Sequence, residues 1–331
     1  MLERASDAMN PLTLCRHRHG PLIGCLDRSM PLLARSARFS VYGLSDDVIV
    51  VHDFSPEEID NNIGGYVAHE LLPLLYRAWP APLSSDEPAQ AIFERCVGAI
   101  VRSVDPSERH AWCLFYDNTL AALRDPLRPG TEGGHPDFIG AFRSIYERCA
   151  ELVAEVPGAR VLDVACCFGF LPLFLAGTGR GDAGAPAAIT GCDLNAALMS
   201  LAEDYRRQRA VDGVAFVRAD VLDRDFAQRI EGETGGYDVV TAIHLLEHLE
   251  PAQTAIAFDH LWAAARRRLV IAVPFEETPD ATFGHRQVFD EARLAALGRR
   301  TNGQARCFTH HGGWLVIDRD PGGICAVEVS R

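Results

Sequence analysis

The chain has 331 residues, of which 48% are hydrophobic and 23% are charged, as in a globular protein with room for two packed units. Its formal net charge of −13 disfavours a nucleic-acid partner, because binding to a polyanion depends on basic surface. No apolar run approaches the ~20 residues of a membrane helix, and acidic residues near the start argue against a signal peptide. We therefore expect a cytoplasmic protein that binds neither nucleic acid nor membrane.

The ten cysteines are scattered along the chain, and none forms a Cys-x-x-Cys pair. This distribution argues against a disulfide framework. Cys149, Cys192 and Cys325 are predicted to be small buried hydrophobic residues.

Residues 1–37 are rich in Arg, His, Pro and Ser and have no sustained hydrophobic period. The run Arg16-His17-Arg18-His19 has the composition of a solvated segment rather than of a site. The sequence predicts a flexible tail over this stretch.

Residues 38–157 are predicted to form a β-hairpin followed by a mostly helical region. The runs RFSVYGL and VIVVHDF flank Ser-Asp-Asp, as two strands joined by a turn do. Ser55, Pro56 and Glu58 then supply an N-cap, a proline at the first helical position and an acid at the third. Helical spacing recurs in EPAQAIFERCVGAIVRSV, in ERHAWCLFYDNTLAAL and in the series Phe138, Phe142, Ile145, Cys149 and Leu152.

Residues 158–331 alternate between short apolar runs and helical sequences. The runs are ARVLDVA, AAITGCDL, GVAFVRAD, YDVVTAI and RLVIAVPF. Such alternation predicts an α/β fold with a Rossmann-like parallel sheet that is covered by helices on both faces. Ligands of these sheets bind at the carboxyl ends of the strands, so we look for the site there.

Three of the predicted strands end in acidic loops. The first passes from Asp163 through small residues to Gly169 and then into an apolar helix, and small side chains let the backbone approach a ligand at a helix N-terminus. The second strand ends at Asp193, where an acid can hydrogen-bond a ribose diol. The third ends at Asp220 and Val221.

This series of loops resembles, in order and over about 170 residues, the motifs of class I S-adenosylmethionine-dependent methyltransferases. The resemblance implies a seven-stranded sheet with a mostly helical N-terminal extension, and S-adenosylmethionine as the cofactor. In that family the first loop holds the methionyl part of the cofactor, the second acid the ribose and the third the adenine. The implied cofactor-binding residues are Asp163, Ala165, Cys167, Gly169, Asp193, Leu194, Asp220, Val221 and His244.

The first loop departs from the Gly-x-Gly-x-Gly pattern of the family, because Ala165 and Cys167 occupy the first two glycine places. If Cys167 takes a positive φ, the strain costs roughly 1 kcal/mol or more. A nicotinamide dinucleotide enzyme is the alternative for such a sheet. Its fingerprint needs the second glycine for the pyrophosphate to approach, so Cys167 favours the methyltransferase.

A histidine cluster follows the fourth strand. His244, Glu247 and His248 stand at positions i, i+3 and i+4, which share one face if the stretch is helical. The same string matches the HxxEH motif of zinc proteases, in which the glutamate is the general base. Its place at the end of a parallel strand, beside a cofactor loop, argues against a protease.

Two interpretations of this cluster stay open. In many class I methyltransferases a Leu-Glu-His-Leu sequence at this point is structural, whereas in small-RNA and quinone-biosynthesis O-methyltransferases a similar sequence holds a divalent metal. A metal would be bound by His244, Glu247, His248 and His285, and it would lower the pKa of an attacking hydroxyl. Imidazole ligands suit manganese, zinc or iron better than magnesium. Glu247, His248 and His285 are the catalytic candidates.

The acceptor is predicted to be a small molecule or an oligosaccharide. Candidate acceptor contacts are Tyr116, Glu276, His310 and His311, with Trp314 as an aromatic plate that suits a carbohydrate. The segments CCFGFLPL, HLLEHLEP, VPFEE with GHRQVFD, and HHGGWLVIDR resemble the mycofactocin oligosaccharide methyltransferases. That resemblance implies O-methylation of a glucose hydroxyl, with Phe115 and Tyr116 in the wall of an acceptor cleft.

Two rival functions remain: O-methylation of a small quinone or phenol, and a non-catalytic methyltransferase-like binding module. The sequence does not predict the oligomeric state.

Overall fold

The computed structural model describes residues 12–17, 30–44, 47–78, 88–125, 137–177, 184–231 and 236–319. The chain divides into two compact units, of which the first comprises residues 1–142 with 281–284 and the second residues 143–280 with 285–331. The boundary falls inside helix α6 (Phe138–Ala154), upstream of the predicted boundary after residue 157. It lies there because Ile145, Cys149 and Leu152 of this helix pack into the core of the second unit.

The first unit contains a four-stranded sheet in the order β1-β4-β3-β2. Its strands are β1 (Leu12–His17), β2 (Leu32–Arg35), β3 (Phe39–Leu44) and β4 (Asp47–His52). β3 and β4 form the predicted antiparallel hairpin, with Val41 opposite Val50. β2 extends this hairpin antiparallel to β3, and β1 pairs with β4 in parallel.

The prediction of a flexible tail over residues 1–37 is wrong for β1 and β2. Both strands lie in this stretch, and Arg16 and His17 pair with Val51 and His52 of β4. The backbones of β4 and β3 provide the pairing partners for β1 and β2. The two strands therefore form although residues 1–37 have no sustained hydrophobic period. Arg18 and His19 lie outside the described residues.

The helices of the first unit follow the sheet. They are η2 (Pro56–Glu58), α1 (Ile63–Tyr66), the π-helical turn η3 (Val67–Leu71), α2 (Leu72–Ala78), α4 (Ala89–Ser103) and α5 (Glu108–Arg124). The predicted cap is present, since the Ser55 amide donates to Glu58 Oε2 over 2.8 Å, but it closes a single 3-10 turn rather than opening a long helix. α4, α5 and α6 confirm the three stretches of predicted helical spacing.

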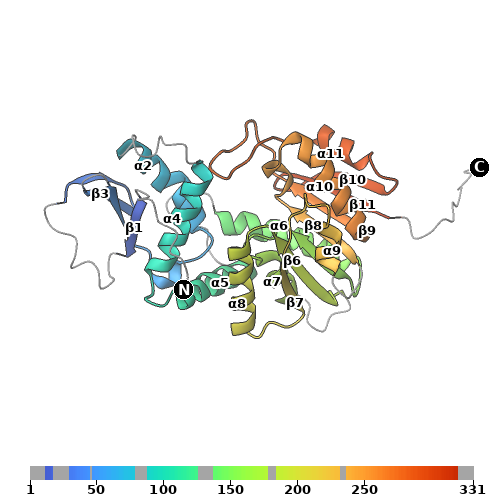
Figure 1. Ribbon diagram of the computed structural model, residues 1–331, viewed down its shortest axis with the longest axis horizontal. Helices are drawn as coiled ribbons and strands as arrows, with labels where there is room; N and C mark the ends of the chain where they lie inside the picture. The colour runs from blue at the N-terminus through green and yellow to red at the C-terminus, as the bar shows by residue number, and fades with distance from the viewer. Residues whose placement is uncertain are drawn as a thin grey trace, which may run out of the picture. The chain divides into compact units, whose positions relative to one another are not determined.

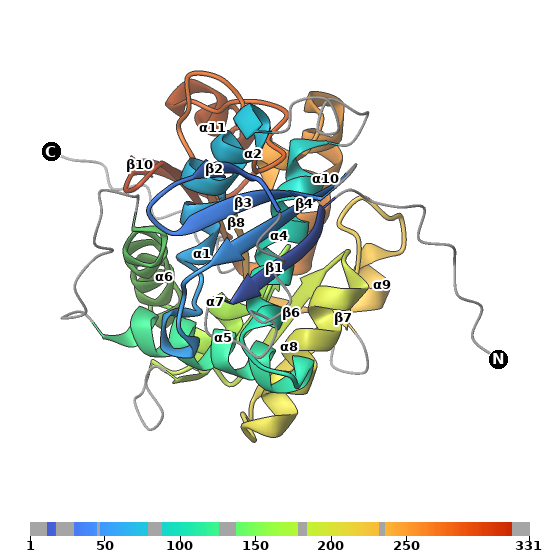
Figure 2. The ribbon, with the colours of Figure 1, turned by 90° about the vertical axis from the view of Figure 1, so that its left-hand side faces the viewer.

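The second unit contains a seven-stranded sheet in the order β10-β11-β9-β8-β5-β6-β7. All of these strands but β5 are labelled in Figure 1, and β6, β7, β8 and β10 are also labelled in Figure 2. Its strands are β5 (Arg160–Val164), β6 (Ala188–Asp193), β7 (Val214–Arg218), β8 (Tyr237–Ile243), β9 (Ala265–Val273), β10 (Gln304–Thr309) and β11 (Gly313–Asp318). β5 to β9 are parallel, and β11 runs antiparallel to both β9 and β10. The predicted Rossmann-like α/β fold is confirmed.

Helices cover both faces of this sheet (Figure 1). Beside α6 they are α7 (Phe170–Gly177), α8 (Ala196–Gln208), α9 (Phe226–Glu231), α10 (Pro251–Ala264) and α11 (Glu291–Gly298). One core contains α6 and α7 packed on residues such as Val161 and Val270. The other contains α9, α10 and α11 packed on residues such as Leu162 and Ile271. The strands therefore read as continuous apolar runs because both of their faces are buried.

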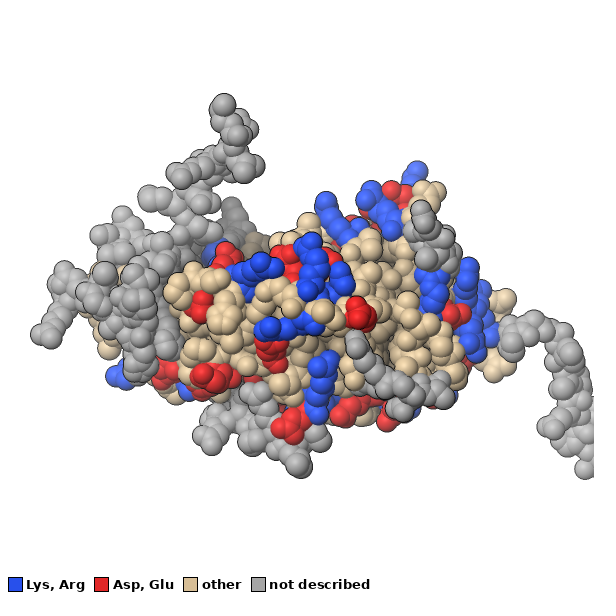
Figure 3. All heavy atoms as spheres, turned by 90° about the horizontal axis from the view of Figure 1, so that it is seen from below, with Lys and Arg blue, Asp and Glu red and all other residues tan. Residues whose placement is uncertain are grey.

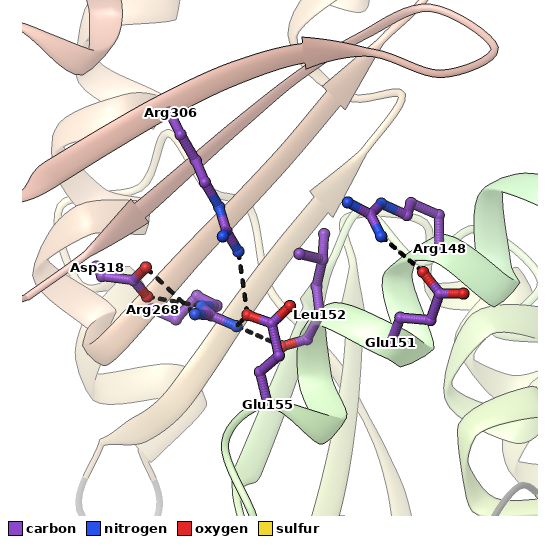
Figure 4. Close-up of polar contacts among 7 residues, drawn as sticks. All are labelled: Arg148, Glu151, Leu152, Glu155, Arg268, Arg306 and Asp318. Carbon is purple, nitrogen blue, oxygen red and sulfur yellow. Dashed lines mark hydrogen bonds and ion pairs between the residues drawn. The ribbon is translucent and has the colours of Figure 1, made fainter.

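Arg268 of β9 anchors the end of α6 to strands β9 and β11 of the sheet (Figure 4). Its guanidinium donates to Asp318 over 2.6 Å, to Glu155 over 2.7 Å and to the Leu152 carbonyl over 2.7 Å. Arg306 of β10 also donates to Glu155, over 3.1 Å. A buried guanidinium is tolerated here because acceptors surround it.

None of the helices among the described residues is long and apolar enough to cross a membrane. Cys149 and Cys192 are buried free thiols, as predicted, and Cys325 lies outside the described residues.

Candidate functional site

The strand order of the second sheet reverses between β5 and β8. The chain goes from β5 outward to β6 and β7, and then returns to the other side of β5 to form β8. In open α/β sheets a crevice forms at such a switch point, outside the carboxyl ends of the strands. The acidic loops after β5 and β6 and the histidine cluster after β8 all lie at this edge.

Asp163 is the buried acid at the end of β5. Its side chain is 3% exposed, and Oδ1 accepts a hydrogen bond of 2.7 Å from Thr241 Oγ1 on β8. The pKa of Asp163 is raised to about 7 by burial and by the charge of Asp193, which together outweigh the lowering effect of the hydrogen bond from Thr241. This carboxyl group ties together the two strands that flank the switch point.

The loop after β5 is strained at the two places where the sequence lacks glycine. Ala165 has φ +61° and Cys167 has φ +50°, in the left-handed region that side chains disfavour. Each costs roughly 1 kcal/mol or more relative to glycine. Gly169 has φ +74°, and a Cβ there would lie 2.4 Å from the Phe216 ring. The loop keeps the backbone course of a glycine-rich loop, and one glycine is essential to it.

Asp193 joins the first loop to the second. Its Oδ2 accepts from the Cys167 amide over 3.0 Å and its Oδ1 from the Asn195 amide over 2.8 Å. Burial raises the pKa of Asp193, opposed by these backbone hydrogen bonds. Asn195 in turn caps α8, and Leu194 beside the acid is 64% exposed. The loop thus presents an acid next to an apolar side chain.

The third loop, after β7, is fixed by its own backbone and by a helix. Asp220 Oδ1 accepts from the Leu222 amide over 2.9 Å, and the Ala219 amide donates to the Asp193 carbonyl over 3.0 Å. His260 of α10 lies 2.6 Å from the Val221 carbonyl through Nδ1. Val221 itself is buried, so of this pair only Asp220 offers a polar side chain.

The stretch after β8 is not an α-helix, so the predicted i, i+3, i+4 face does not form. His244 has φ +56°, and only Leu246–His248 form the 3-10 turn η5. Among the described residues, Glu247, His248 and His285 each offer a ligand atom within 4.8 Å of the others. His244 is not a member of this group. Burial, together with the neighbouring His285 and His248, lowers the pKa of His244 to about 4.

Glu247 is buried, with 1% of its surface exposed, and neither carboxylate oxygen has a hydrogen-bond partner among the other described residues. The pKa of Glu247 is raised to about 8 by burial and by the charge of Glu276, which outweigh the lowering effect of its own backbone amide. Next to Glu247 the rings of His248 and His285 meet edge to face, with centroids 4.9 Å apart. A buried acid without a hydrogen-bond partner is costly, which makes Glu247 a candidate ligand for a cation.

His285 is oriented by Glu276. Its Nδ1 lies 2.8 and 3.0 Å from the two Glu276 oxygens, so Nε2 is the nitrogen that Glu276 does not engage. A carboxylate behind an imidazole fixes its tautomer and ring orientation. Glu276 therefore orients His285 through these hydrogen bonds and is not a contact for the acceptor.

Four residues predicted to face an acceptor do not do so. Phe115 and Tyr116 of α5 are 0% exposed, because that helix buries them in the first unit. Trp314 is also 0% exposed and packs in the core that contains α6, so it is not an aromatic plate. His310 hydrogen-bonds Ser144 of α6 through Nε2, over 3.0 Å, and accepts at its carbonyl from the Trp314 indole. Of the predicted acceptor contacts, His311 alone is solvent-exposed, at φ +47°.

Sequence reasoning missed Thr241, His260 and Gln287, which hold the site residues through hydrogen bonds. Thr241 was recognisable as the one hydroxyl within the interior of the run YDVVTAI. The other two are single polar residues without a motif, and only the fold brings them to the site.

Comparison of the sequence with known protein families finds a match for part of the second unit. Residues 161–268 match the family described as "Methyltransferase domain". No curated protein sequence matches the chain. Solved structures similar to it include an O-methyltransferase family protein from Burkholderia thailandensis, with 16% identity, a TM-score of 0.49 and coverage of 86% of this chain and 80% of that one.

Two further solved structures match about half of the chain. The methyltransferase domain of a bacterial Hen1 protein has 18% identity and a TM-score of 0.43, and the match covers 54% of this chain and 100% of that one. Magnesium protoporphyrin IX methyltransferase from Synechocystis PCC 6803 has 18% identity and a TM-score of 0.40, covering 57% and 90%. Part of the second unit is therefore similar in sequence to a methyltransferase domain, and its strand order is that of a Rossmann-like sheet.

Proposed function

We propose that the protein is an S-adenosylmethionine-dependent O-methyltransferase. The observation that carries this proposal is the arrangement at one sheet edge of a strained cofactor-type loop, two strand-end acids and a buried Glu-His-His group. The fit to the cofactor rests on Gly169, where a Cβ would strike Phe216, and on Asp163 and Asp193 at adjacent strand ends. When bound, S-adenosylmethionine supplies a methyl group on a sulfonium.

In this proposal the chain binds and orients the cofactor by its loops. Asp163 attracts the cationic methionyl end, Asp193 accepts from the ribose hydroxyls, and Leu194 and Asp220 face the adenine. Because the backbone after β5 is already fixed by the Cys167–Asp193 and Gly169 contacts, little ordering remains to be done on binding. Such preorganisation sets the methyl group in line for attack.

We further propose that Glu247, His248 and His285 hold a divalent metal. The fit rests on the unpaired, buried carboxylate of Glu247 and on two imidazoles with ligand atoms within 4.8 Å. When bound, the metal supplies a Lewis acid that lowers the pKa of the acceptor hydroxyl. Two nitrogens and one carboxylate suit manganese or zinc better than magnesium. Glu276 keeps His285 in the tautomer that a ligand role requires, and neutral His244 lines the group.

The finer proposal for the acceptor is a sugar hydroxyl, of a glucose in the mycofactocin oligosaccharide. It is supported by the four sequence segments that resemble those methyltransferases. The burial of Trp314 removes the aromatic plate as a separate argument for a carbohydrate.

An RNA acceptor is disfavoured by the net charge of −13, because a polyanion needs basic surface. Basic and acidic side chains are interspersed on the face shown in Figure 3. Several of the basic residues are also paired, as Arg206 is with Glu203 and Arg207 with Asp204 on α8. Such pairing leaves less positive charge for phosphates.

The proposal is tested by methyl-transfer assays with radiolabelled S-adenosylmethionine and a panel of acceptors. The panel contains a β-glucan oligosaccharide, a catechol, a hydroquinone and a short RNA, each with and without manganese. Transfer to the oligosaccharide supports the sugar hydroxyl, whereas transfer to the catechol or hydroquinone alone replaces it with the quinone/phenol function. Binding of S-adenosylhomocysteine without transfer to any acceptor would favour the non-catalytic binding module.

A further inference from the structure

Two separate stretches of the second unit build the Glu-His-His group. Glu247 and His248 lie on the turn after β8, and His285 begins the extended stretch that leads to α11. His248 and His285 are 37 residues apart in the chain, so contacts between the two stretches must set their spacing. Gln287, two residues after His285, makes most of these contacts.

The Gln287 side chain is buried, at 5% exposure, and contacts the turn directly. Its Nε2 lies 2.9 Å from the Leu246 carbonyl, 2.8 Å from the Leu249 carbonyl and 2.7 Å from Thr254 Oγ1. The two carbonyls bracket Glu247 and His248. Its Oε1 accepts from Arg293 of α11 over 2.5 Å, which fixes which end of the amide carries the donors.

The backbone of the same stretch completes the contact. The Arg286 amide donates to the Glu247 carbonyl over 2.7 Å, and the Gln287 amide lies 3.4 Å from the same oxygen. Residues 286 and 287 thus donate hydrogen bonds to the carbonyls of Leu246, Glu247 and Leu249. His285 is the residue immediately before these donors, so the same bonds place it against the turn.

The turn needs such support because its own acidic side chain gives none. The Glu247 carboxylate makes no hydrogen bond to any other described residue that would hold it in its buried position. A polar group kept in an unfavourable environment persists only where the surrounding structure determines it. Here the determining contacts come from Gln287 and from the Arg286 amide.

We propose that Gln287 is a positioning residue, which holds the Leu246–Leu249 turn so that Glu247 and His248 face His285 at the spacing a divalent cation requires. This inference rests on the proposed metal site. Supporting residues of this kind are expected to change metal affinity by about 10-fold to 100-fold.

The competing structural role would be support of the fold alone, through the bond from Gln287 to Arg293 and α11. Gln287→Glu separates the two roles, because it keeps the length and the acceptor for Arg293 but removes the donors to Leu246 and Leu249. The added negative charge would by itself strengthen cation binding, so a loss of affinity reports on position. Gln287→Met removes the donors without a charge, and serves if the first variant does not fold.

The experiment measures Mn²⁺ and Zn²⁺ binding to the metal-stripped full chain by calorimetry, at a temperature well below unfolding, with S-adenosylhomocysteine binding as a second readout. We expect either Gln287 variant to lose about tenfold or more in Mn²⁺ affinity while its S-adenosylhomocysteine affinity changes by less than about twofold. Leu294→Val is the control, since it removes a buried methylene of α11 and leaves the hydrogen bonds to the turn intact, and should lower the melting temperature but keep Mn²⁺ affinity.

Unchanged Mn²⁺ affinity in a folded Gln287 variant would overturn the positioning role while leaving the metal site intact. An equal loss of both affinities would also overturn it, in favour of general destabilisation. A wild-type chain that binds neither ion would overturn the proposed metal site, and the inference with it.

Discussion

The two halves of one sheet edge differ in how their acids are hydrogen-bonded. At the ends of β5 and β6, Asp163 and Asp193 each accept hydrogen bonds from neighbouring residues, and the backbone between them carries the strain. After β8, Glu247 accepts none from the other described residues, and the hydrogen bonds go to the backbone around it. The first half shapes a loop, whereas the second contains the acid of the proposed metal group.

The difference teaches that burial alone does not define the role of an acid. Burial raises the pKa of Asp163 and of Glu247, to about 7 and about 8. Their partners separate them: Asp163 is hydrogen-bonded within the protein, whereas the buried carboxylate of Glu247 makes no such bond to the other described residues and is the group that the proposed metal would contact.

The largest expected effect is on Glu247. Glu247→Gln should lower methyl transfer by at least about 100-fold, because it removes the one carboxylate of the proposed metal group. The melting temperature at neutral pH should change little, because the pKa of about 8 keeps this carboxyl mostly protonated and glutamine is a neutral group of similar size. Glu250→Gln is the matched control, because Glu250 lies in an exposed ion pair with Arg286, and it should stay active. Full activity of the Glu247 variant would show that this carboxylate is not needed for methyl transfer, and would contradict the proposed difference between the two halves of the sheet edge.

Asp163→Asn sharpens the comparison through pH. The pKa of Asp163 in the folded protein, about 7, lies above the ordinary value of 3.8, so ionisation opposes folding as pH rises from about 4 to 7. The variant lacks this penalty, and its unfolding free energy relative to wild type should rise by about 2–3 kcal/mol between pH 5 and pH 8. Denaturant unfolding at the two pH values measures it, with Asp259→Asn, in an exposed pair with Arg300, as control. A pH-independent difference would contradict a raised pKa for Asp163.

Asp193→Ala should weaken S-adenosylhomocysteine binding by about tenfold or more, because it removes the proposed ribose contact and the acceptor for the Cys167 and Asn195 amides. Calorimetry measures the change, and Asp204→Ala on the exposed side of α8 provides a control with the same substitution. Unaltered affinity would remove Asp193 from the cofactor site.

Cys167→Gly should have the smallest effect. Relief of the positive φ should stabilise the protein by about 0.5–1 kcal/mol after the greater flexibility of glycine in the unfolded chain is counted. Ala210→Gly, at φ +48° outside the site, should gain a similar amount. Thermal unfolding compares the two variants, and a loss of stability at Cys167 alone would show that its side chain stabilises the loop.

Much of the fold was predictable because it follows from local pattern. The runs that became β5 to β9 are mostly apolar, and the loops after them carry the acids that the fold places at one edge. The positive φ of Cys167 also followed from its place in the loop. These features depend on residues that are near one another in the sequence.

The errors arose where distant contacts decide. β2 forms because the edge of β3 offers it a partner, and Trp314 is buried because α6 packs over it, neither of which the local sequence reveals. The face expected for His244, Glu247 and His248 required a helix, whereas the chain forms a 3-10 turn held by Gln287. His285 still meets that turn, through backbone bonds between stretches that no motif connects.

The assignment of the site to S-adenosylmethionine is tested most directly by the thermal stability of the metal-stripped protein with S-adenosylhomocysteine and with NAD, each with and without manganese or zinc. A ligand that binds only the folded state raises the melting temperature by mass action. We predict a rise with S-adenosylhomocysteine, a further rise with manganese or zinc, and no response to NAD. Stabilisation by NAD alone would contradict the methyltransferase assignment of the site.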